Sequence, residues 1–477
     1  MSMTLGELLA GTGRPGVLSR ARVIGPDDVS VSSVVIDSRA VTAGSVFCCI
    51  RGAAFDGHTF AASAVASGAA AIVVDHELDL PAGVPQVVVD DVRAAVGHLA
   101  AVAHGRPADR LTMVGVTGTN GKTTTTAMIA SILGAAGRRV GVIGTLSGAR
   151  TTPEAPELQE RLASFLAEGI DTVVMEVSSH ALLMYRVNGC HFDAAVFTNL
   201  SRDHLDLHGT MEQYFAAKAR LFDPTLSERG ITCVDDPHGR LLLDASPIPS
   251  EGWSIDDVSD ASVTPTRVRA TWRGQELDVP LGGEFNLSNA IGAATCAAAL
   301  GVDTATIAAG LASLEPVPGR MEAVPGGHGF DVIVDYAHTP DGLAAALSAA
   351  RPGRPGRLVV VFGCGGDRDR EKRPEMGRIA AEGADLVVVT SDNPRSEDPQ
   401  AIIDAILGGV GADYRAHVLC EPDRRRAIEA AVGWARPGDV VLIAGKGHEA
   451  TQTIGASVLP FDDRAVAREV LSGGTVR

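Results

Sequence analysis

Short apolar runs alternate with longer stretches of helical periodicity along most of this chain. In its middle third, the pattern predicts strands at 111–116, 139–143, 171–177 and 193–198. In its last third, strands are predicted near 331–335, 357–362, 385–390 and 439–444, with helices between them. Strands that alternate with helices build parallel sheets covered on both faces. We therefore expect two doubly wound α/β regions, the second of the Rossmann type.

Capping signals place the ends of several helices in the middle third. A helix is predicted from Lys122 to about Ala136, with Gly137 just beyond its end. Thr152 before Pro153 has the order of an N-cap followed by a first-turn proline, which predicts a helix from Pro153. Thr210 and Gln213 form a capping-box pattern that opens a helix running through Lys218.

The first third contains only short apolar runs, at 33–36, 45–50, 70–74 and 86–89, which predict a small α/β domain. Segments with Pro or Gly at 106–110 and 314–320 separate regions that each have their own strand and helix pattern. With 477 residues the chain exceeds the usual size of one core. The predicted domains are 1–109, 110–317 and 318–477.

Composition and charge narrow the possible partners. The chain is 45% hydrophobic but only 4% aromatic, as is typical of helix-covered parallel sheets. A formal net charge of -17 disfavours a surface for nucleic acid or for an anionic membrane. The seven cysteines form no C-x-x-C pair, which predicts reduced thiols and argues against zinc. No leader or spanning apolar segment is seen, so we expect a soluble cytoplasmic protein, a monomer by default.

The sequence VGVTGTNGKTT at 114–124 follows one predicted strand and opens a helix. Small residues let successive backbone N–H groups face one anion, Lys122 can reach the outer phosphates, and the Thr123 hydroxyl can ligate magnesium. The common phosphate-loop pattern requires glycine where Val116 stands, which disfavours ordinary GTPases and motor ATPases. We therefore expect a nucleoside triphosphate at this loop.

Polar residues follow almost every predicted strand, where ligands bind in open α/β sheets. Glu176 ends one strand and is the best second magnesium ligand; the alternative is a structural acid held by Ser178 or Ser179. His204 could ligate a second metal or position phosphate, or be an ordinary loop histidine. Lys218 is, on its own pattern, a lysine on the solvated face of a helix.

The last third has two polar strand exits of its own. The sequence GCGGDRD at 363–369 lacks the G-x-G-x-x-G spacing of a dinucleotide site, so a dehydrogenase is disfavoured. In DNPR, Asp392 and Asn393 suit an ammonium group and Arg395 can hold a carboxylate through two parallel hydrogen bonds. Glu449 could accept from an ammonium group as well. The alternative for this segment is a plain turn before a helix.

In addition to these motifs, the chain carries DSR (37–39), DGHTF (56–60), TTP (151–153), MEVSSH (175–180), TNLSRDHLD (198–206), FNLSN (285–289), DYAHTPD (335–341) and GKGHE (445–449). In this order and over nearly its full length, the chain resembles the Mur ligases of peptidoglycan synthesis. The resemblance implies an ATP- and Mg²⁺-dependent amide ligase that joins meso-diaminopimelate to UDP-N-acetylmuramoyl-L-alanyl-D-glutamate through an acyl phosphate.

The resemblance also assigns site residues. It implies ATP contacts at Gly118, Thr119, Asn120, Gly121, Lys122, Thr123, Thr124, Asn286, Arg320 and Asp335. It implies contacts to the UDP-muramoyl dipeptide at Ser38, Thr151, Thr152, Ser178, Ser179 and Arg186. It implies contacts to diaminopimelate at Arg368, Asp392, Asn393, Arg395, Gly445 and Glu449. Metal ligands would be Thr123, Glu176, His204 and Lys218 as a CO2-derived carbamate, and the catalytic residues Lys122, Lys218, His204 and Glu176.

Three alternatives remain at this stage. A ligase that adds L-lysine is one alternative, but L-lysine has no distal carboxylate for Arg395 to bind. A ligase like folylpolyglutamate synthetase shares the acyl-phosphate chemistry but would not need DNPR or a UDP-binding first domain. A non-catalytic nucleotide-binding regulator would not need Thr123, Glu176, His204 and Lys218 together.

Overall fold

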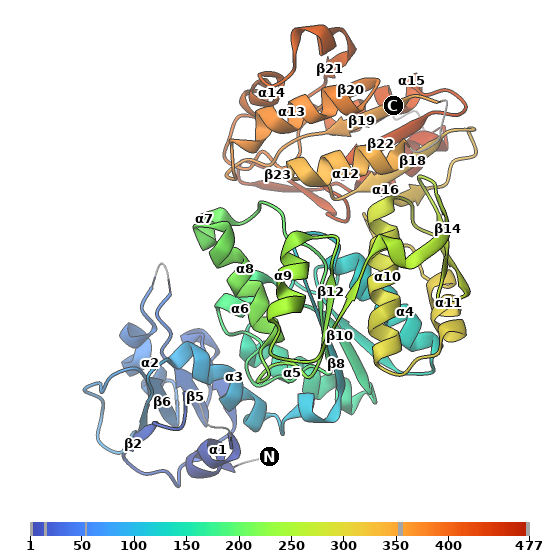
Figure 1. The fold of residues 1–477 in the computed structure, drawn as a ribbon. Helices are drawn as coiled ribbons and strands as arrows, with labels where there is room; N and C mark the ends of the chain where they lie inside the picture. Colours follow the sequence, from blue (N-terminus) through green and yellow to red (C-terminus); the bar gives the residue numbers. More distant parts are fainter. Residues whose placement is uncertain (1–2, 14–16, 53–54, 352–355, 474–477) are drawn as a thin grey trace. The chain divides into compact units, whose positions relative to one another are not determined.

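The structure is a computed structural model that describes residues 3–13, 17–52, 55–351 and 356–473 (Figure 1). Its contacts divide the chain into two compact units. The first unit is Met1–Gly118 with Gly137–Gly252, and the second is Thr119–Ala136 with Trp253–Arg477. The predicted class is confirmed: the fold is α/β with three main sheets. Where the domain boundaries fall stays a prediction.

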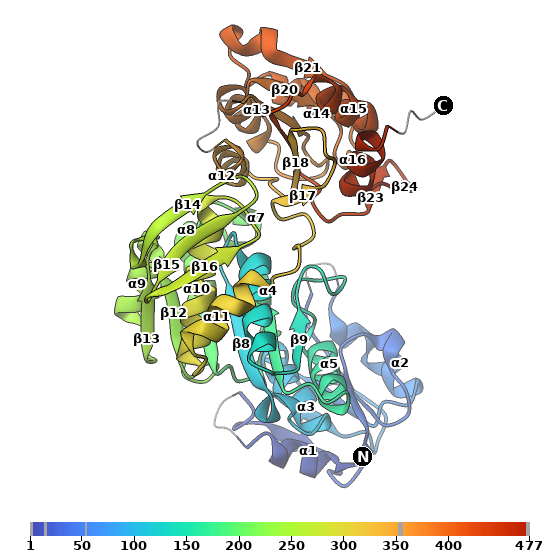
Figure 2. The ribbon, with the colours of Figure 1, turned by 90° about the vertical axis from the view of Figure 1, so that its right-hand side faces the viewer.

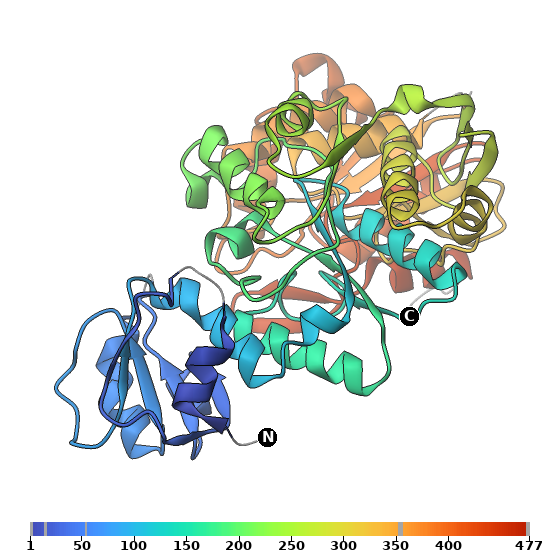
Figure 3. The same ribbon diagram turned by 60° about the horizontal axis from the view of Figure 1, so that its bottom comes forward.

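The N-terminal sheet has the order β2-β7-β6-β5-β4, in which β4 to β7 are parallel and β2 is antiparallel. Its elements are β2 (Arg22–Ile24), β4 (Ser33–Val35), β5 (Ser45–Cys48), β6 (Ala71–Val74), β7 (Gln86–Val88), α1 (Leu5–Gly11), α2 (Ala61–Ala66) and α3 (Val92–Ala103). Because side chains alternate along a strand, Val46 and Cys48 pack with α1 and α3, whereas Phe47 packs with α2. The ribbon of this domain, in blue, has helices beside its sheet (Figure 3). The predicted small α/β domain is therefore present.

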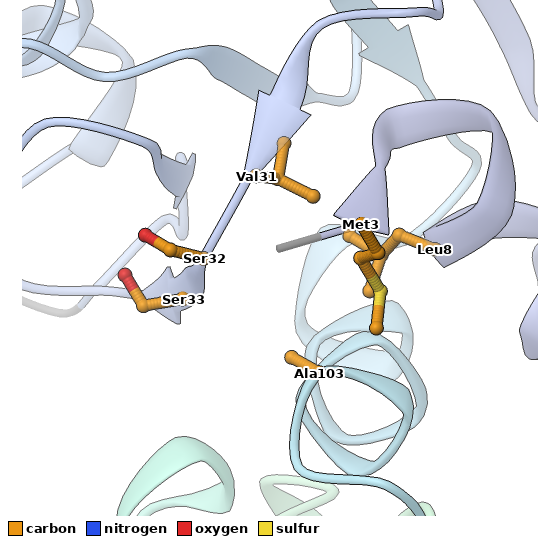
Figure 4. Close-up of a pocket in the computed structure, with 6 residues that line it drawn as sticks. All are labelled: Met3, Leu8, Val31, Ser32, Ser33 and Ala103. Carbon is orange, nitrogen blue, oxygen red and sulfur yellow. The ribbon is translucent and has the colours of Figure 1, made fainter. Parts of the chain in front are cut away.

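A small pocket beside this sheet illustrates its close packing. A two-stranded sheet of β1 (Met3–Thr4) and β3 (Ser30–Val31) lies against α1. Met3, Leu8, Val31 and Ala103 converge there with Ser32 and Ser33, and leave no room for a water molecule (Figure 4). We treat this feature as part of the core.

The central sheet has the order β13-β12-β11-β8-β10-β9. Its elements are β8 (Thr112–Thr117), β9 (Val140–Ile143), α5 (Ala155–Ala167), β10 (Thr172–Glu176), α6 (Ser179–Leu183), β11 (Ala194–Phe197), α7 (Leu205–His208), α8 (Met211–Ala219), β12 (Gly230–Cys233), α9 (Pro237–Ala245) and β13 (Ser250–Trp253). β8 pairs in parallel with β10 and β11. The apolar residues of α5, α8 and α9 cover one face of this sheet. The predicted strands agree with these bounds to within one or two residues.

One predicted helix start is wrong. The helix expected from Pro153 begins at Ala155, and its N-cap is Glu154, which makes no side-chain capping bond. The Thr152 hydroxyl instead donates to the carbonyl of Glu176 at 2.9 Å. A contact with the neighbouring strand has therefore replaced the local capping bond.

Within the first unit, α3 of the N-terminal part contacts residue 188, in the loop before β11 of the central sheet. The Asn188 side chain donates to the Ala94 carbonyl of α3 at 3.0 Å. A Cβ atom placed on Gly97 would lie only 2.1 Å from the Asn188 carbonyl oxygen. Only glycine permits this approach of α3 to residue 188.

The second unit contains α4 (Lys122–Ala135), which continues from the loop after β8 and packs on α10 (Glu284–Ala299) and α11 (Thr304–Ala312). The predicted bounds of α4 are confirmed, and Gly137 has the left-handed φ of 81°. An antiparallel sheet of β14 (Val258–Val263), β15 (Val268–Trp272) and β16 (Gln275–Val279) lies beside α10 and α11 (Figure 2). The sequence pattern gave no indication of this sheet.

The C-terminal sheet has the order β17-β18-β22-β19-β20-β21, with only β17 antiparallel. Its elements are β17 (Glu322–Val324), β18 (Asp331–Asp335), α12 (Pro340–Ala350), β19 (Leu358–Phe362), α13 (Lys372–Gly383), β20 (Leu386–Val389), α14 (Pro399–Leu407), β21 (Val418–Cys420), α15 (Arg424–Trp434), β22 (Val440–Ala444) and α16 (Asp463–Leu471), with a hairpin of β23 (Thr451–Ile454) and β24 (Ser457–Pro460). Helices α12 to α14 cover one face, and α15 and α16 the other. The predicted Rossmann-type arrangement is therefore present.

Candidate functional site

The loop between β8 and α4 has the geometry of a phosphate-binding loop. Gly118 and Gly121 have φ angles of 147° and 84°, in the region that favours glycine. A Cβ atom on Gly121 would lie 2.4 Å from Asn289 Oδ1, so no other residue fits there. The Lys122 ammonium group donates to the Thr119 carbonyl at 2.8 Å, which folds its side chain back over the loop. The predicted order of strand, glycine-containing loop and helix is therefore present, whereas the ATP contacts assigned to its residues stay predictions.

Three residues of the second unit are predicted to bind ATP. Asn286 and Arg320 make contacts near the start of α4, and Asp335 ends β18. The Asn286 carboxamide oxygen accepts from Asn289, the residue that lies against Gly121, at 3.1 Å. Arg320 donates to the Thr123 hydroxyl at 3.3 Å and lies over the Tyr336 ring. The residues predicted at this end of α4 therefore lie in one contact network.

Asp335 has a role in the fold that the sequence did not predict. Its carboxylate accepts from the backbone N–H groups of Met321 and Ala337 at 2.8 and 2.9 Å. Burial raises the pKa of Asp335, although the charge of Arg320 and the two backbone hydrogen bonds oppose this shift. Asp335 thus fixes the chain at the end of β18.

In the first unit, most residues predicted to bind the muramoyl dipeptide gather near the end of β10. The Thr152 hydroxyl accepts from the Ser178 backbone N–H at 3.1 Å. Arg186 pairs with Glu154 at 2.7 Å and donates to the Thr152 carbonyl. Burial, opposed by Glu154, lowers the pKa of Arg186. Ser179 contacts His208 Nε2 at 3.0 Å. The predicted residues of this group are therefore brought together.

Thr145 joins this group although the sequence analysis did not identify it. Its backbone N–H and its hydroxyl donate to the two oxygens of Glu176 at 2.7 and 3.2 Å, and its hydroxyl lies 3.0 Å from that of Thr151. Gly144 leaves the space, since a Cβ atom there would lie 2.3 Å from Glu176 Oε1. Thr145 follows a predicted strand, so the rule that ligands lie at strand ends could have found it.

Lys218 is buried, so the prediction of a solvated helix face is wrong. Its side chain lies on the inner face of α8, and the residue is 1% exposed. The ammonium group donates to the Gly118 carbonyl of the phosphate loop at 2.6 Å and lies 4.5 Å from the centre of the Tyr214 ring. A lysine 100 positions away in sequence therefore contacts the loop directly.

His204 lies near the same aromatic ring. Its backbone has a left-handed φ of 53°, and its side chain is 60% exposed beside Asp203. Its ring meets the Tyr214 ring edge-on at 6.4 Å, whereas His208 packs on Tyr214 at 4.9 Å. Burial lowers the pKa of His208, which favours its neutral form. His204 and Lys218 are thus neighbours of one tyrosine.

A cavity of about 980 Å³ lies within the first unit, between the N-terminal and central sheets. Ser38 lines it, together with Asp37 and Arg39 of the DSR motif. The Arg39 guanidinium holds the pKa of Asp37 at about 2. The sequence analysis missed most of the other lining residues, among them Phe47, Phe60, Arg93, Arg150 and Glu154. This volume suits a large ligand with both aromatic and charged groups.

The residues predicted to bind diaminopimelate converge at the ends of three parallel strands of the C-terminal sheet. Asn393 donates to Glu449 Oε2 at 2.7 Å, which joins the segments after β20 and β22. A Cβ atom on Gly445 would lie 2.6 Å from Asp392 Oδ2. Arg395, at a φ of 52°, donates to the Gly366 carbonyl at 2.7 Å. These contacts bring GCGGDRD, DNPR and GKGHE together.

Arg368 belongs to the same place. A Cβ atom on Gly365 would lie 2.9 Å from the Arg395 guanidinium and 3.7 Å from the Arg368 side chain, so the two arginines flank Gly365.

The sequence analysis missed two supporting residues. Arg424 is fully buried, pairs with Asp463 at 2.7 Å and donates to the carbonyls of Ser391 and Ala444. Gln452 donates to the Asp392 carbonyl at 2.8 Å.

No helix in the described parts of the chain has the length and apolar character needed to cross a membrane. All seven cysteines are free thiols, and all but Cys420 are buried. Burial raises the pKa of the Cys190 thiol to about 12, which disfavours the reactive thiolate.

Three family models match the chain in order: the Mur ligase family catalytic domain at 30–104, the Mur ligase middle domain at 116–297, and the Mur ligase glutamate ligase domain at 319–447. The chain is 46% identical to a UDP-N-acetylmuramoyl-L-alanyl-D-glutamate--2,6-diaminopimelate ligase of Geobacillus kaustophilus, over 93% of this chain and 94% of that protein. A protein of the same name from Gloeobacter violaceus is 47% identical, over 99% and 98%. A solved structure with this name is 33% identical, with full coverage of both chains and a TM-score of 0.71.

Proposed function

This chain belongs to the Mur ligase family, and we propose that it joins meso-2,6-diaminopimelate to the D-glutamyl carboxylate of UDP-N-acetylmuramoyl-L-alanyl-D-glutamate, with hydrolysis of ATP to ADP and phosphate. The observation that carries the proposal is the convergence of Asn393, Arg395 and Glu449 at one sheet edge. Carboxylate and carboxamide oxygens can accept from an ammonium group, and a guanidinium can bind a carboxylate.

The reaction has two steps. An oxygen of the D-glutamyl carboxylate attacks the γ-phosphorus of ATP, so that a P–O bond forms as the bond to ADP breaks. An amine of diaminopimelate then attacks the acyl carbon, the new C–N bond forms, phosphate leaves and the nitrogen loses a proton. Lys122 and the backbone N–H groups of its loop would bind the transferring phosphoryl group, which becomes crowded with negative charge.

Thr123 and Glu176 each offer the hard oxygen donors that Mg²⁺ prefers. Both are buried, Thr123 in the second unit and Glu176 in the first. When bound, the ion neutralises phosphate charge. The assignment of Thr123, Glu176 and His204 as its ligands stays a proposal.

We also propose that Lys218 carries CO2 as a carbamate. The ammonium group first loses one proton to water. The neutral amine then attacks CO2, a C–N bond forms as one C=O π bond opens, and a second proton leaves to water, so that a cation becomes an anion. Burial of Lys218 at 1% exposure supports this, since removal from water favours the neutral amine that reacts. Bicarbonate labelled with ¹³C should produce a carbamate signal in the NMR spectrum of the wild-type protein and none in Lys218→Arg.

The muramoyl dipeptide would occupy the first unit. We propose that its nucleotide end enters the cavity lined by Ser38 and its peptide end reaches Thr152, Ser178 and Arg186.

We place the protein in the cytoplasm, where its free thiols would stay reduced.

The decisive experiment is a substrate panel with mass spectrometry of the UDP-linked product. Purified protein with ATP, Mg²⁺ and the UDP-muramoyl dipeptide should gain the mass of diaminopimelate, and L-lysine should react far more slowly. Equal reaction of L-lysine would assign the chain to the lysine-adding ligases. Turnover with folate and glutamate, or ATP hydrolysis without a longer peptide, would contradict the proposal.

A further inference from the structure

Lys446, in the GKGHE segment after β22, is a second fully buried lysine to which the proposed reaction gives no role. Its side chain is 0% exposed. Its ammonium group donates to the Thr451 carbonyl at 2.6 Å and to Glu449 Oε2 at 3.3 Å. A buried ammonium group is costly unless it is paired and hydrogen-bonded, and Lys446 meets both conditions through these two partners.

Glu449 Oε2 is shared between two donors. Asn393 of DNPR donates to it at 2.7 Å, and Lys446 donates from the other segment. Both described partners of the Glu449 side chain therefore bind the same oxygen, which leaves Oε1 for an incoming donor. An ammonium group of the amino-acid substrate has the chemistry to be that donor.

The second bond of Lys446 organises the other side of the site. Thr451 begins β23, and the next two residues of that strand hold DNPR. Gln452 donates to the Asp392 carbonyl at 2.8 Å, and the Thr453 backbone N–H donates to Asn393 Oδ1 at 2.9 Å. Lys446 thus connects Glu449 to the strand that fixes Asp392 and Asn393.

We propose that Lys446 is a positioning residue for the amine donor. It does not touch the substrate. It holds Oε2 of Glu449 so that Oε1 faces the ammonium group, and it fixes the start of β23 so that Asn393 keeps its orientation. The inference rests on the proposed function, because it names how the same site binds diaminopimelate.

The test compares Lys446→Met and Lys446→Gln with wild type in steady-state kinetics. A charge-assisted hydrogen bond contributes enough for a ten- to hundredfold effect, so both variants should raise KM for meso-diaminopimelate by about tenfold or more. The kcat value and the KM for ATP should change by less than about threefold, since neither the phosphate loop nor its lysine is touched. Lys446→Gln keeps an N–H donor for Thr451, so it remains informative if Lys446→Met does not fold.

A double-mutant cycle separates positioning from general damage. In a Glu449→Gln background, Lys446→Met should add less than about threefold to the KM for diaminopimelate, because the two residues act through one interaction. Arg357→Met is the matched control. It breaks an ion pair with Asp439 of 2.6 Å at the opposite end of β22, and should leave the KM for diaminopimelate unchanged.

Two outcomes would overturn the inference: an unchanged KM for diaminopimelate in both Lys446 variants, or fully multiplicative effects of Lys446→Met and Glu449→Gln. Failure of the proposed function is distinguishable, because in that case the wild-type protein itself would not extend the UDP-linked peptide with diaminopimelate.

Discussion

The strand ends of the central sheet and those of the C-terminal sheet are built differently. At the phosphate loop, both lysines donate to main-chain carbonyls: Lys122 to that of Thr119 and Lys218 to that of Gly118. At the C-terminal sheet, side chains also bind carbonyls, but one carboxylate there joins separate segments, since Asn393 and Lys446 both donate to Glu449. The first site is thus a local loop with one distant lysine, whereas the second is a network of three segments.

This difference has consequences for mutation. A substitution at the phosphate loop should change one chemical function and leave its neighbours in place. A substitution in the C-terminal network should alter several contacts at once, because the Glu449 carboxylate there serves two donors. Three variants test this contrast, in order of decreasing expected effect.

Lys218→Ala should have the largest effect. Removal of the proposed carbamate should lower kcat/KM by about a hundredfold or more, the usual cost of one group that stabilises developing charge. Because the loop stays folded, acetate or another short carboxylate should restore part of the activity, measured as ADP release.

Arg220→Ala is the control for Lys218→Ala, since Arg220 is a cation close by in sequence that donates to the Leu182 carbonyl. Its smaller loss should not respond to acetate. Absence of rescue in Lys218→Ala would count against the carbamate, and equal rescue in both variants would show a non-specific effect of the anion.

Arg395→Ala should have an intermediate effect that is confined to the amino acid. Loss of a guanidinium–carboxylate pair should reduce the preference for diaminopimelate over L-lysine by about ten- to hundredfold, measured as the ratio of kcat/KM values. Arg370→Ala removes a 72% exposed cation near the same loop and should keep the preference. Retention of the preference in Arg395→Ala would place carboxylate recognition elsewhere.

Glu397→Gln should have the smallest effect, on stability rather than on catalysis. Hydrogen bonds from Arg373 and from the Asp367 backbone hold the pKa of Glu397 at about 2, below its ordinary value of 4.5. A lowered carboxyl pKa stabilises the folded state above about pH 4.5, and this contribution is lost as the pH falls towards 2.

The variant should therefore melt a few degrees below wild type near pH 7, and this gap should narrow as the pH falls from 5 to 3, followed by thermal unfolding. Glu382→Gln, which breaks an exposed helix pair with Arg378, is the control and should change melting little. A gap for Glu397→Gln that stays constant with pH would contradict the assigned pKa.

Much of the fold follows from hydrophobic pattern alone. The buried strands of the sheets are short, continuous apolar runs, such as 358–362, so their positions were predicted to within a residue or two. The sheet of β14 to β16 was missed because β14 has the sequence VSDASV and is mostly exposed. A half-exposed strand of mixed polarity has little periodic signal.

The candidate site could likewise be predicted only in part. The phosphate loop could be predicted because its chemistry lies in consecutive residues. The burial of Lys218 could not, since its partner Gly118 lies 100 residues earlier in the chain. The roles of Lys446 and Arg424 depend on carbonyl groups of other strands and loops, and no local pattern encodes such contacts.

The glycine contact between α3 and residue 188 bears on how a nucleotide-linked sugar would be chosen. Since the backbones of Gly97 and Asn188 meet with no room for a methyl group, α3 keeps a fixed distance from residue 188. The same helix contributes Arg93 to the lining of the large cavity. A ligand that enters a preorganised cavity has to order little of the protein on binding. Its size and shape then decide whether it fits.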